Sequence, residues 1–385
     1  MNESAEVAIL GAGIGGLTLA AQLQSRNIPF RVYEQAPGLS EIGAGLGLWS
    51  NATRCLSQIG VGESFWAEHG CEVQSAEIAS ASGRVLSHCD VRPVVEKLGT
   101  RSYVVHRADL HRAIAGKVSP ESIELGKKLV CLEQLDNGVV LQFADGSRSS
   151  AAIAVGADGL HSRVRAGLFG EDAPHYSGQT CYRGIAQREI DERHVLREIQ
   201  GKGPRAAVIP LDDRRVYWWT TEAAPEGGCR SPEDEKAHLL ALFADWAFGV
   251  PEVIAATPAD AILRNDLYDR PPLPSWSRGR VTLLGDAAHP TTPNLGQGAC
   301  MAIEDAYCLG NLLERDVEPG AAFSRYESIR KRHCEGIVKA SRRFGWIGGW
   351  SDPLAVRLRE VLMATTPEFA VRRSLEKNIA PSFSI

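Results

Sequence analysis

The sequence predicts an α/β fold, with a Rossmann-like nucleotide-binding domain, an interleaved β-sheet domain and C-terminal helices. Three observations favour this class. A glycine-rich turn joins an apolar segment to a helical one near the N-terminus, two later apolar segments end in Gly-Ala-Asp-Gly and Gly-Asp, and the middle of the chain is rich in strand-forming residues. A length of 385 residues suggests two or three domains and can bury a large core without disulfides or a metal.

The first unit follows the order strand, turn, helix, strand. Apolar residues at 7–10 predict a strand, and the turn Gly-Ala-Gly-Ile-Gly-Gly occupies 11–16. Helical periodicity covers 17–26, and a second strand is expected at 30–33. A unit of this order, about 30 residues long, is typical of a dinucleotide-binding fold.

The residues of the turn suit a pyrophosphate. Gly11 permits a tight turn, Gly13 lets the backbone approach the phosphates, and Gly16 lets the helix pack closely on the strand. The helix N-terminus then presents free N–H groups to the ligand. Glu34 ends the second strand, where its carboxylate can accept both ribose hydroxyls. These features predict a dinucleotide site, but they do not separate NAD from FAD.

The later elements are predicted from the same periodicities and turn residues. They are a strand at 103–106 and a helix at 107–117, a hairpin at 139–143 and 151–155, strands at 178–187, 206–209 and 215–221, a helix at 231–248, a strand at 280–284, and helices at 296–314 and 320–343. The expected domains are a nucleotide domain over 1–177 with a possible small substrate-domain insertion near 71–102, a β-rich substrate domain over 178–270, a return of the nucleotide domain over 271–345, and a C-terminal helix and tail over 346–385.

Composition argues against several classes of function. The 42 Lys and Arg residues against 47 Asp and Glu residues leave a net charge of -5, so we expect no nucleic-acid partner. The uncharged stretch at 7–25 contains four glycines and two glutamines, and we expect no integral membrane association. Nine cysteines without Cys-x-x-Cys or zinc-site spacing indicate reduced thiols, a cytoplasmic protein and no metal. A monomer or a homodimer is expected.

Two later motifs indicate which dinucleotide is bound. The segment at 156–165 reads Gly-Ala-Asp-Gly-Leu-His-Ser-Arg-Val-Arg, and the segment at 285–306 runs from Gly-Asp-Ala-Ala-His-Pro through Gly-Gln-Gly to Glu-Asp-Ala. With the turn at 11–16, and over most of residues 5–340, the chain resembles the FAD-dependent monooxygenases of the aromatic-hydroxylase type. The resemblance is greatest to the group that includes urate hydroxylase, 6-hydroxynicotinate monooxygenase and zeaxanthin epoxidase.

The resemblance implies an activity and its cofactors. FAD would be the bound cofactor, NADH or NADPH the transient electron donor and O2 the co-substrate. A small aromatic or heteroaromatic molecule would be hydroxylated through a flavin C4a-hydroperoxide. Two alternatives stay open: epoxidation of an alkene, and a flavin dehydrogenase or oxidase that inserts no oxygen.

The resemblance also implies roles for cofactor-binding residues. In such enzymes the residue matching Glu34 binds the adenosine ribose, that matching Arg107 reaches the pyrophosphate, and that matching Asp286 binds the ribityl chain. Asp158 belongs to a motif that supports both FAD and nicotinamide binding. The other implied cofactor-binding residues are Gln35, Ala44, Gly45, Leu129, Gly296, Gln297, Gly298 and Ala299. Independently, a helix opening at 296–298 would direct N–H groups and partial positive charge toward the flavin.

The substrate side should come from the β-rich domain. The segments at 180–184 and 215–219 are unusually aromatic, and strand alternation places Tyr217 and Trp219 on one face and Trp218 on the other. The first face could cover a flat substrate, or the aromatic rings could simply fill the core of the sheet.

Further site residues are assigned by resemblance to urate hydroxylase. Arg205 matches its substrate-anchoring arginine and Tyr217 its pocket tyrosine, whereas Asn294 stands where that enzyme has an aspartate. The remaining expected pocket residues are Leu48, Trp49, Tyr182, Arg183 and Pro293.

Three basic side chains near the motifs have open roles. His289 could act as an acid or base at the flavin edge, or it could bond loop carbonyls. Arg163 and Arg165 could bind nicotinamide phosphates, or they could be solvated surface residues.

Overall fold

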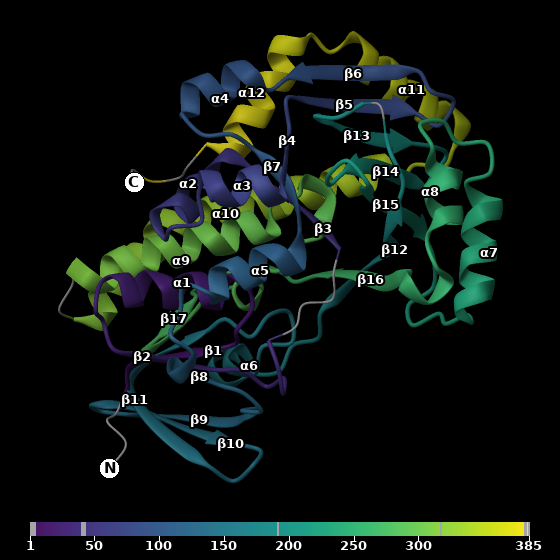
Figure 1. Ribbon diagram of the computed structural model, residues 1–385. Coiled ribbons are helices and arrows are strands. Elements are labelled where there is room, and N and C mark those ends of the chain that lie inside the picture. Colours follow the sequence, from purple (N-terminus) through teal and green to yellow (C-terminus); the bar gives the residue numbers. More distant parts are fainter. Residues whose placement is uncertain (1–4, 40–43, 191, 316–317, 381–382, 384–385) are drawn as a thin grey trace.

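The computed structural model describes residues 5–39, 44–190, 192–315, 318–380 and 383 (Figure 1). Its first sheet is built on parallel strands around the glycine-rich turn. The strands follow the order β17 (Ser277–Arg278), β18 (Val281–Leu283), β11 (Arg148–Gly156), β1 (Ala5–Leu10), β2 (Phe30–Tyr33) and β8 (Ile123–Glu124), and the hairpin strands β9 (Leu129–Leu135) and β10 (Gly138–Phe143) extend β11. Because β1, β2, β11 and β18 are parallel, their carboxyl ends meet at one edge of the sheet, where open α/β sheets bind ligands.

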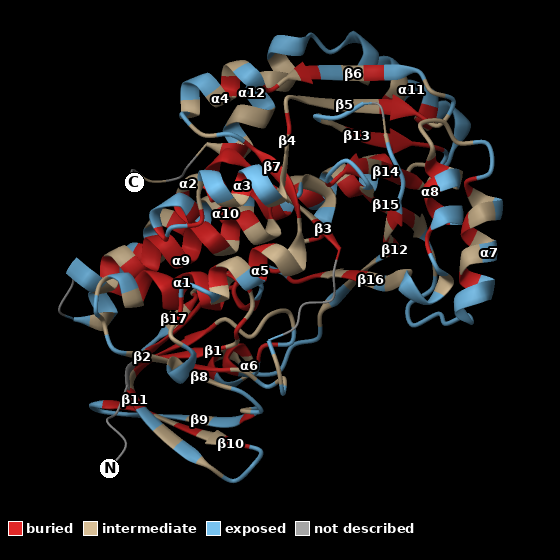
Figure 2. Ribbon diagram, viewed as in Figure 1, coloured by how far each residue is buried: buried red, intermediate tan, exposed pale blue. Residues whose placement is uncertain are grey.

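Helices pack on this sheet and form the largest core. They are α1 (Ile14–Ser25), α2 (Ser50–Gln58), α3 (Glu63–His69), α5 (Arg107–Ala115), α6 (Arg163–Phe169), α9 (Gly298–Arg315) and α10 (Pro319–Gly348). Helix α9 contacts α1, α2 and α10, and Figure 2 shows it as one of the most buried elements. Its buried side chains cover most of its circumference, which is typical of an interior helix.

A second sheet lies on the other side of the helices (Figure 1). Its order is β16 (Leu263–Asp269), β12 (His175–Gln187), β15 (Arg215–Ala223), β14 (Arg205–Pro210), β13 (Val195–Gln200), β5 (Ser75–Ser80) and β6 (Val85–Asp90). The strands β5 and β6 come from the segment where a small insertion was expected, and β5 pairs in parallel with β13. A small third sheet contains β3 (Gly45–Leu48), β7 (Tyr103–His106) and β4 (Gly70–Glu72).

The two faces of the second sheet pack against different elements. Trp218 and Val216 lie in one cluster with Leu239 and Phe243 from the α7 segment. The helices α7 (Pro232–Leu242) and α8 (Val250–Ala256) cover that cluster. The outer edge of the sheet near β6 is flanked by α4 (Arg92–Leu98), α11 (Pro353–Thr365) and α12 (Glu368–Ile379). The opposite face, which includes Tyr217, packs toward the first domain.

Two of the predicted segments differ in the structure. The helix expected at 231–248 ends at Leu242, because the following residues turn and Phe248 and Gly249 adopt positive φ angles of 61° and 75°. The C-terminal forty residues form two helices where one helix and a tail were expected. None of the described helices is long and apolar enough to cross a bilayer. All nine cysteines lie within the described ranges and are free.

Gly16→Ala tests the close packing of the first turn. A Cβ at position 16 would lie 2.0 Å from the carbonyl oxygen of Gly11, so backbone must move to admit it. We expect a loss of about 2 kcal/mol or more in the free energy of unfolding, measured by urea denaturation. The control is Gly167→Ala in α6, where a Cβ meets no atom within 4 Å; it should gain about 0.5–1 kcal/mol. Equal stability of the two variants would contradict the packing argument.

Candidate active site

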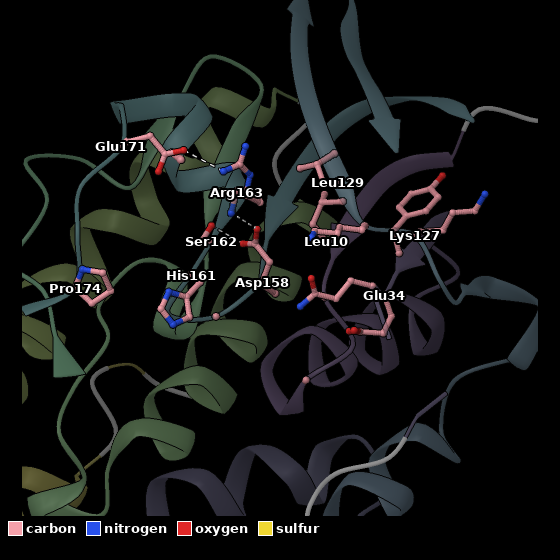
Figure 3. Close-up of a pocket in the computed structure, with 18 of the residues that line it drawn as sticks. Leu10, Glu34, Lys127, Leu129, Asp158, His161, Ser162, Arg163, Glu171 and Pro174 are labelled. Carbon is pink, nitrogen blue, oxygen red and sulfur yellow. Dashed lines mark hydrogen bonds and ion pairs between the residues drawn. The ribbon is translucent and has the colours of Figure 1, made fainter. Parts of the chain in front are cut away.

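A cavity of about 810 Å³ opens at the carboxyl edge of the first sheet. In Figure 3, Glu34, Lys127 and Leu129 line one side, and Asp158 and Arg163 line the other. The predicted residues Gly11, Gly13 and Gln35 also line it. The strand ends and the glycine-rich turn therefore form one continuous wall.

The turn has the shape that a pyrophosphate requires. Gly11 has a φ of 109°, and a Cβ there would lie 2.5 Å from the carbonyl oxygen of Ala157. Gly13 is the N-cap of α1 and has no side-chain cap, and a Cβ there would meet no atom within 4 Å. Gly13 thus borders open space, and the first N–H groups of α1 have no side-chain cap, which suits an anion.

Glu34 is held beside the glycine-rich turn. Its carboxylate accepts from the backbone N–H of Ala12 at 2.7 Å and of Ala36 at 2.8 Å. Gln35 is exposed and Leu129 is buried at the start of β9, both on the cavity wall. This wall offers a carboxylate, backbone groups and apolar surface, which fits an adenosine.

Asp158 organises the opposite wall. It accepts from the N–H groups of Arg163 at 2.7 Å and Val164 at 3.1 Å, and thereby caps α6. Arg163 is exposed and pairs with Glu171 at 3.0 Å. Asp158 supports the cavity through this cap.

Arg165 is not available to a nicotinamide phosphate. It is buried, pairs with Asp172 at 3.0 Å and donates to the carbonyl oxygens of Ala287 and Ala288 at 3.3 Å. The suggestion that Arg165 is a phosphate site is wrong, because its hydrogen bonds tie α6 to the Gly-Asp turn. Arg163 keeps that open role.

Asp286 lies in the turn after β18. Its side chain is exposed, yet dense protein around it raises the pKa of Asp286, and the positive charges of His289 and Arg107 only partly offset this effect. The carboxyl group is thus accessible from solvent although protein atoms surround it, and it lies outside the lining of the cavity beside Glu34 and Asp158. Arg107 begins α5, and its N–H donates to the Ala44 carbonyl at 2.9 Å.

Glycines shape the loop at Gly45 and the start of α9. A Cβ at Gly45 would lie 2.2 Å from the ring of Tyr217, so the ring occupies the space that a side chain would need. Gly296 has a φ of 61° and is followed by Gln297, whose side chain is buried. Helix α9 begins at Gly298, as expected, and its second residue is the half-buried Ala299.

His289 lies in a buried ion network. Its Nε2 is 2.5 Å from Asp305, and the guanidinium of Arg330 bonds Asp305 at 2.7 Å and Glu304 at 3.1 Å. Burial disfavours the charged ring, but Cys334 and Asp305 hold the pKa of His289 well above its usual range. Burial likewise opposes charge on Asp305, but His289 and Arg330 hold the pKa of that carboxyl well below its usual range. These contacts favour a structural role for His289 over an acid–base role.

Three residues of the same region carry potential metal-ligand atoms. Ligand atoms of His289, Asp305 and Cys334 lie within 4.8 Å of one another. Arg330 already bonds Asp305, however, so the acid is balanced by protein cations.

On the substrate side, Arg205 and Asn294 lie together. Arg205 is buried, and it donates to Asn294 at 2.6 Å and to Gln179 at 3.2 Å. Glu198 lies 3.4 Å from its guanidinium, so the positive charge is balanced. No sequence motif marks Gln179 or Glu198, because their contacts with Arg205 depend on how the strands pair.

Two glycines of α10 make room for this pair. A Cβ at Gly345 would lie 2.3 Å from the Asn294 amide, and one at Gly348 would lie 2.7 Å from Arg205. The Phe-Gly-Trp-Ile-Gly-Gly-Trp segment was the available signal for this close approach.

Tyr182 is wrong as a pocket residue. It pairs with Thr220 and packs beside Trp218 in the cluster beneath α7, while its hydroxyl donates to Glu222 at 2.8 Å. Arg183, the next residue, pairs with Trp219 and so shares the face of Tyr217. Strand alternation explains the difference, because neighbouring residues point to opposite faces.

The other expected pocket residues divide between the core and the site. Leu48 is buried in the main core. The indole nitrogen of Trp49 would lie 3.4 Å from a Cβ at Gly296, next to the start of α9. Pro293 is exposed in the short turn that carries Asn294.

These features define a Rossmann-type dinucleotide-binding protein whose cavity lies at the carboxyl edge of the first sheet, beside the glycine turn. The residues fit FAD: an open helix N-terminus for the pyrophosphate, a carboxylate for the ribose, and a recessed aspartate further along.

The sequence matches the family described as FAD binding domain over residues 4–341. It is 37% identical over 380 residues to aurachin C monooxygenase/isomerase of Stigmatella aurantiaca, covering 98% of this chain and 99% of that one. It is 36% identical over 352 residues to 3-amino-4-hydroxybenzoate 2-monooxygenase of Streptomyces cremeus, covering 88% and 86%. Klebsiella pneumoniae HpxO complexed with FAD and uric acid superposes with a TM-score of 0.90 at 30% identity, covering 97% and 96%. The chain belongs to this FAD-binding family and is an FAD-dependent monooxygenase of the aromatic-hydroxylase type.

Asp286→Ala tests the recessed aspartate. Removal of its carboxylate should lower the FAD content of the purified protein at least tenfold, because a charged hydrogen bond is worth about 1.5–3 kcal/mol. The ratio of flavin to protein absorbance measures the loss. Asp245→Ala, on an exposed loop, should keep full FAD. A fully yellow Asp286→Ala protein would refute the assignment.

His289→Gln tests the buried ion pair through pH. Since the pKa of His289 is raised on folding, its contribution to stability is complete below the unfolded pKa of about 6.5 and declines as pH rises toward the folded value. The variant should therefore lose more stability at pH ~6 than at pH ~9, with a slope of at most ~1.4 kcal/mol per pH unit. Urea denaturation at both pH values measures this, with the exposed His88→Gln as control. An equal loss at both pH values would contradict the assignment.

Proposed function

We propose that the protein takes electrons from NADH or NADPH and uses O2 to hydroxylate a small aromatic or heteroaromatic substrate. The named activities of the similar proteins support this class of reaction. A cytoplasmic location is proposed with it, in line with the nine free cysteines. Bound FAD would supply the electron transfer and the oxygen activation, while the chain supplies binding, orientation and shielding.

The observation that carries the proposal is the contact between Gly45 and Tyr217. This contact joins the loop beside the cofactor site to the aromatic face of the second sheet. A flat substrate bound on that face would lie between Tyr217 and the start of α9. The N–H groups at that helix start carry partial positive charge, which suits negative charge on a reduced flavin.

Tyr217 would orient the substrate by donating a hydrogen bond. Burial raises the pKa of Tyr217 well above its usual range, and Cys181 adds to the shift, so the hydroxyl keeps its proton. Trp219, two residues further along β15, lies on the same face of the sheet as Tyr217. The centre of its ring is 5.9 Å from the guanidinium carbon of Arg205. These aromatic rings would also keep water from the reacting atoms.

Arg205 would position Asn294 and set the polarity of the pocket. Its charge is balanced by Glu198, and its strongest contact is with the Asn294 carbonyl. The pair therefore presents a neutral hydrogen-bonding group rather than a free cation. This favours an uncharged heteroaromatic or phenolic substrate.

The proposed activity can be tested with purified protein, NADH or NADPH, and a panel of phenols and heteroaromatic compounds. One compound should stimulate nicotinamide oxidation with little release of hydrogen peroxide, and product structure should show a ring hydroxyl. An epoxide as sole product, or peroxide equal to the nicotinamide consumed, would contradict the proposal in favour of the epoxidase or the oxidase.

Arg205→Gln is expected to raise the KM for the aromatic substrate about tenfold or more, because a buried charged hydrogen bond is lost and Glu198 loses its cationic partner. Its FAD content should not change. Steady-state kinetics and flavin absorbance measure the two effects. Arg214→Gln, an exposed residue beside β15, is the matched control. An unchanged KM in Arg205→Gln would remove Arg205 from the substrate side.

A further inference from the structure

Helix α11 exposes an apolar face. Its sequence is apolar on most sides, a composition typical of a buried helix, yet only Val356 and Arg359 among its residues are buried. Four large apolar side chains are more than half exposed: Leu354 79%, Leu358 54%, Val361 51% and Leu362 55%. Their spacing of three and four residues places them along one side of the helix.

The neighbouring helices add exposed aromatic side chains. Trp346, near the end of α10, is 66% exposed and packs edge-on against Trp350 at 5.3 Å. Phe369, in the first turn of α12, is 70% exposed. Both α11 and α12 contact β6 and lie along the outer edge of the second sheet (Figures 1 and 2). We call these exposed residues of α10, α11 and α12 the C-terminal apolar face.

Unpaired positive charges accompany the C-terminal apolar face. On α10, Arg343 precedes Trp346 by three residues; on α11, Arg357 lies between Leu354 and Val361 at helical spacing. On α12, the exposed Arg373 and Lys377 follow Phe369 at intervals of four residues. On α10, the exposed Lys339 precedes Arg343 by four residues. Within the described residues, none of these five side chains has a hydrogen-bond or ion-pair partner.

The acidic side chains of the same segment are all engaged. Asp352 caps α11 by accepting from two backbone N–H groups, at 3.0 and 2.9 Å. Glu360 pairs with Arg84, Glu368 with Arg372, and Glu376 with Lys97. The charge left unbalanced on this face is therefore positive, although the whole chain has a net charge of -5.

We propose that the C-terminal apolar face docks the protein on the surface of an anionic lipid bilayer. Leu, Val, Trp and Phe interspersed with Arg and Lys form the pattern of an interfacial surface: the apolar groups enter the headgroup region and the cations meet lipid phosphates. A two-fold contact with a second copy would instead bring the same cations face to face, which opposes association. Charge complementarity thus favours the bilayer over a second copy.

The face is connected to the substrate side. Arg359 of α11 donates to the Gly348 carbonyl at 2.7 Å and to the Gly201 carbonyl at 2.7 Å. Gly348 in turn packs against Arg205. A docked protein would hold its substrate pocket near the bilayer, which suits an aromatic substrate dissolved in lipid. This consequence rests on the proposed function, but the docking itself does not.

The test is co-sedimentation of the FAD-loaded protein with vesicles. Vesicles of phosphatidylcholine containing phosphatidylglycerol should bind the protein at least tenfold more strongly than vesicles of phosphatidylcholine alone, since each basic residue near an anionic surface adds about 1 kcal/mol, or roughly fivefold. Arg357→Gln with Arg373→Gln should lower the anionic preference by roughly tenfold or more. High salt should weaken the binding.

Leu358→Asp with Leu362→Asp should abolish binding to either vesicle. The matched control is Val130→Asp, which changes an apolar residue that is 54% exposed on β9, and it should bind like the unchanged protein. Flavin absorbance and thermal unfolding show that each variant is folded and loaded, and these readouts do not depend on substrate. Absence of binding to anionic vesicles by the unchanged protein would overturn the proposal. A second result would also overturn the proposal. In that result, the unchanged protein binds no vesicles but forms a dimer in sedimentation velocity, and Leu358→Asp with Leu362→Asp dissociates the dimer.

Discussion

The structure depends on one close approach of backbone to backbone. The turn after β1 lies so near the end of β11 that a Cβ at Gly11 would meet the Ala157 carbonyl, and α1 lies so near the turn that a Cβ at Gly16 would meet the Gly11 carbonyl. This approach brings the carboxyl ends of β1, β2 and β11 together and aims the uncapped start of α1 into the cavity. Glu34 can bond the turn only because β2 ends beside it. The cofactor site therefore follows from the absence of two side chains.

The second sheet approaches the first domain at positions where glycine leaves room for a neighbouring side chain. Tyr217 fills the position where Gly45 has no side chain, and Arg205 and Asn294 fill those left by Gly348 and Gly345. The contacts of Gly45 with Tyr217 and of Gly348 with Arg205 join the second sheet to glycine backbone outside it, whereas the contact of Gly345 with Asn294 joins α10 to the turn before α9. The proposed substrate face is consequently part of the interface between the domains, and α10 borders it through Gly345 and Gly348. The buried network of His289, Asp305 and Arg330 links the turn after β18 to α9 and α10.

Much of the cofactor site could be predicted from the sequence, because its motifs are local. The strand at 30–33, the helix start at 298 and the placing of Glu34 depend on residues close in the chain. Tyr182 and Arg165 were misassigned because their partners, Glu222 and Asp172, are not visible in a motif. Strand alternation did separate Tyr217 and Trp219 from Trp218, and the same rule would have excluded Tyr182 had its register with β15 been known. The apolar residues of α11 give no sign in the sequence of being exposed.

The central claim is that oxygen from O2 enters the substrate at a site between the cofactor cavity and the Tyr217 face. The most direct measurement is a single turnover with ¹⁸O-labelled O2, followed by mass spectrometry of the product. One labelled oxygen atom per product molecule is the predicted result. A product that is oxidised but carries no label, with the label in hydrogen peroxide or water alone, would contradict the account.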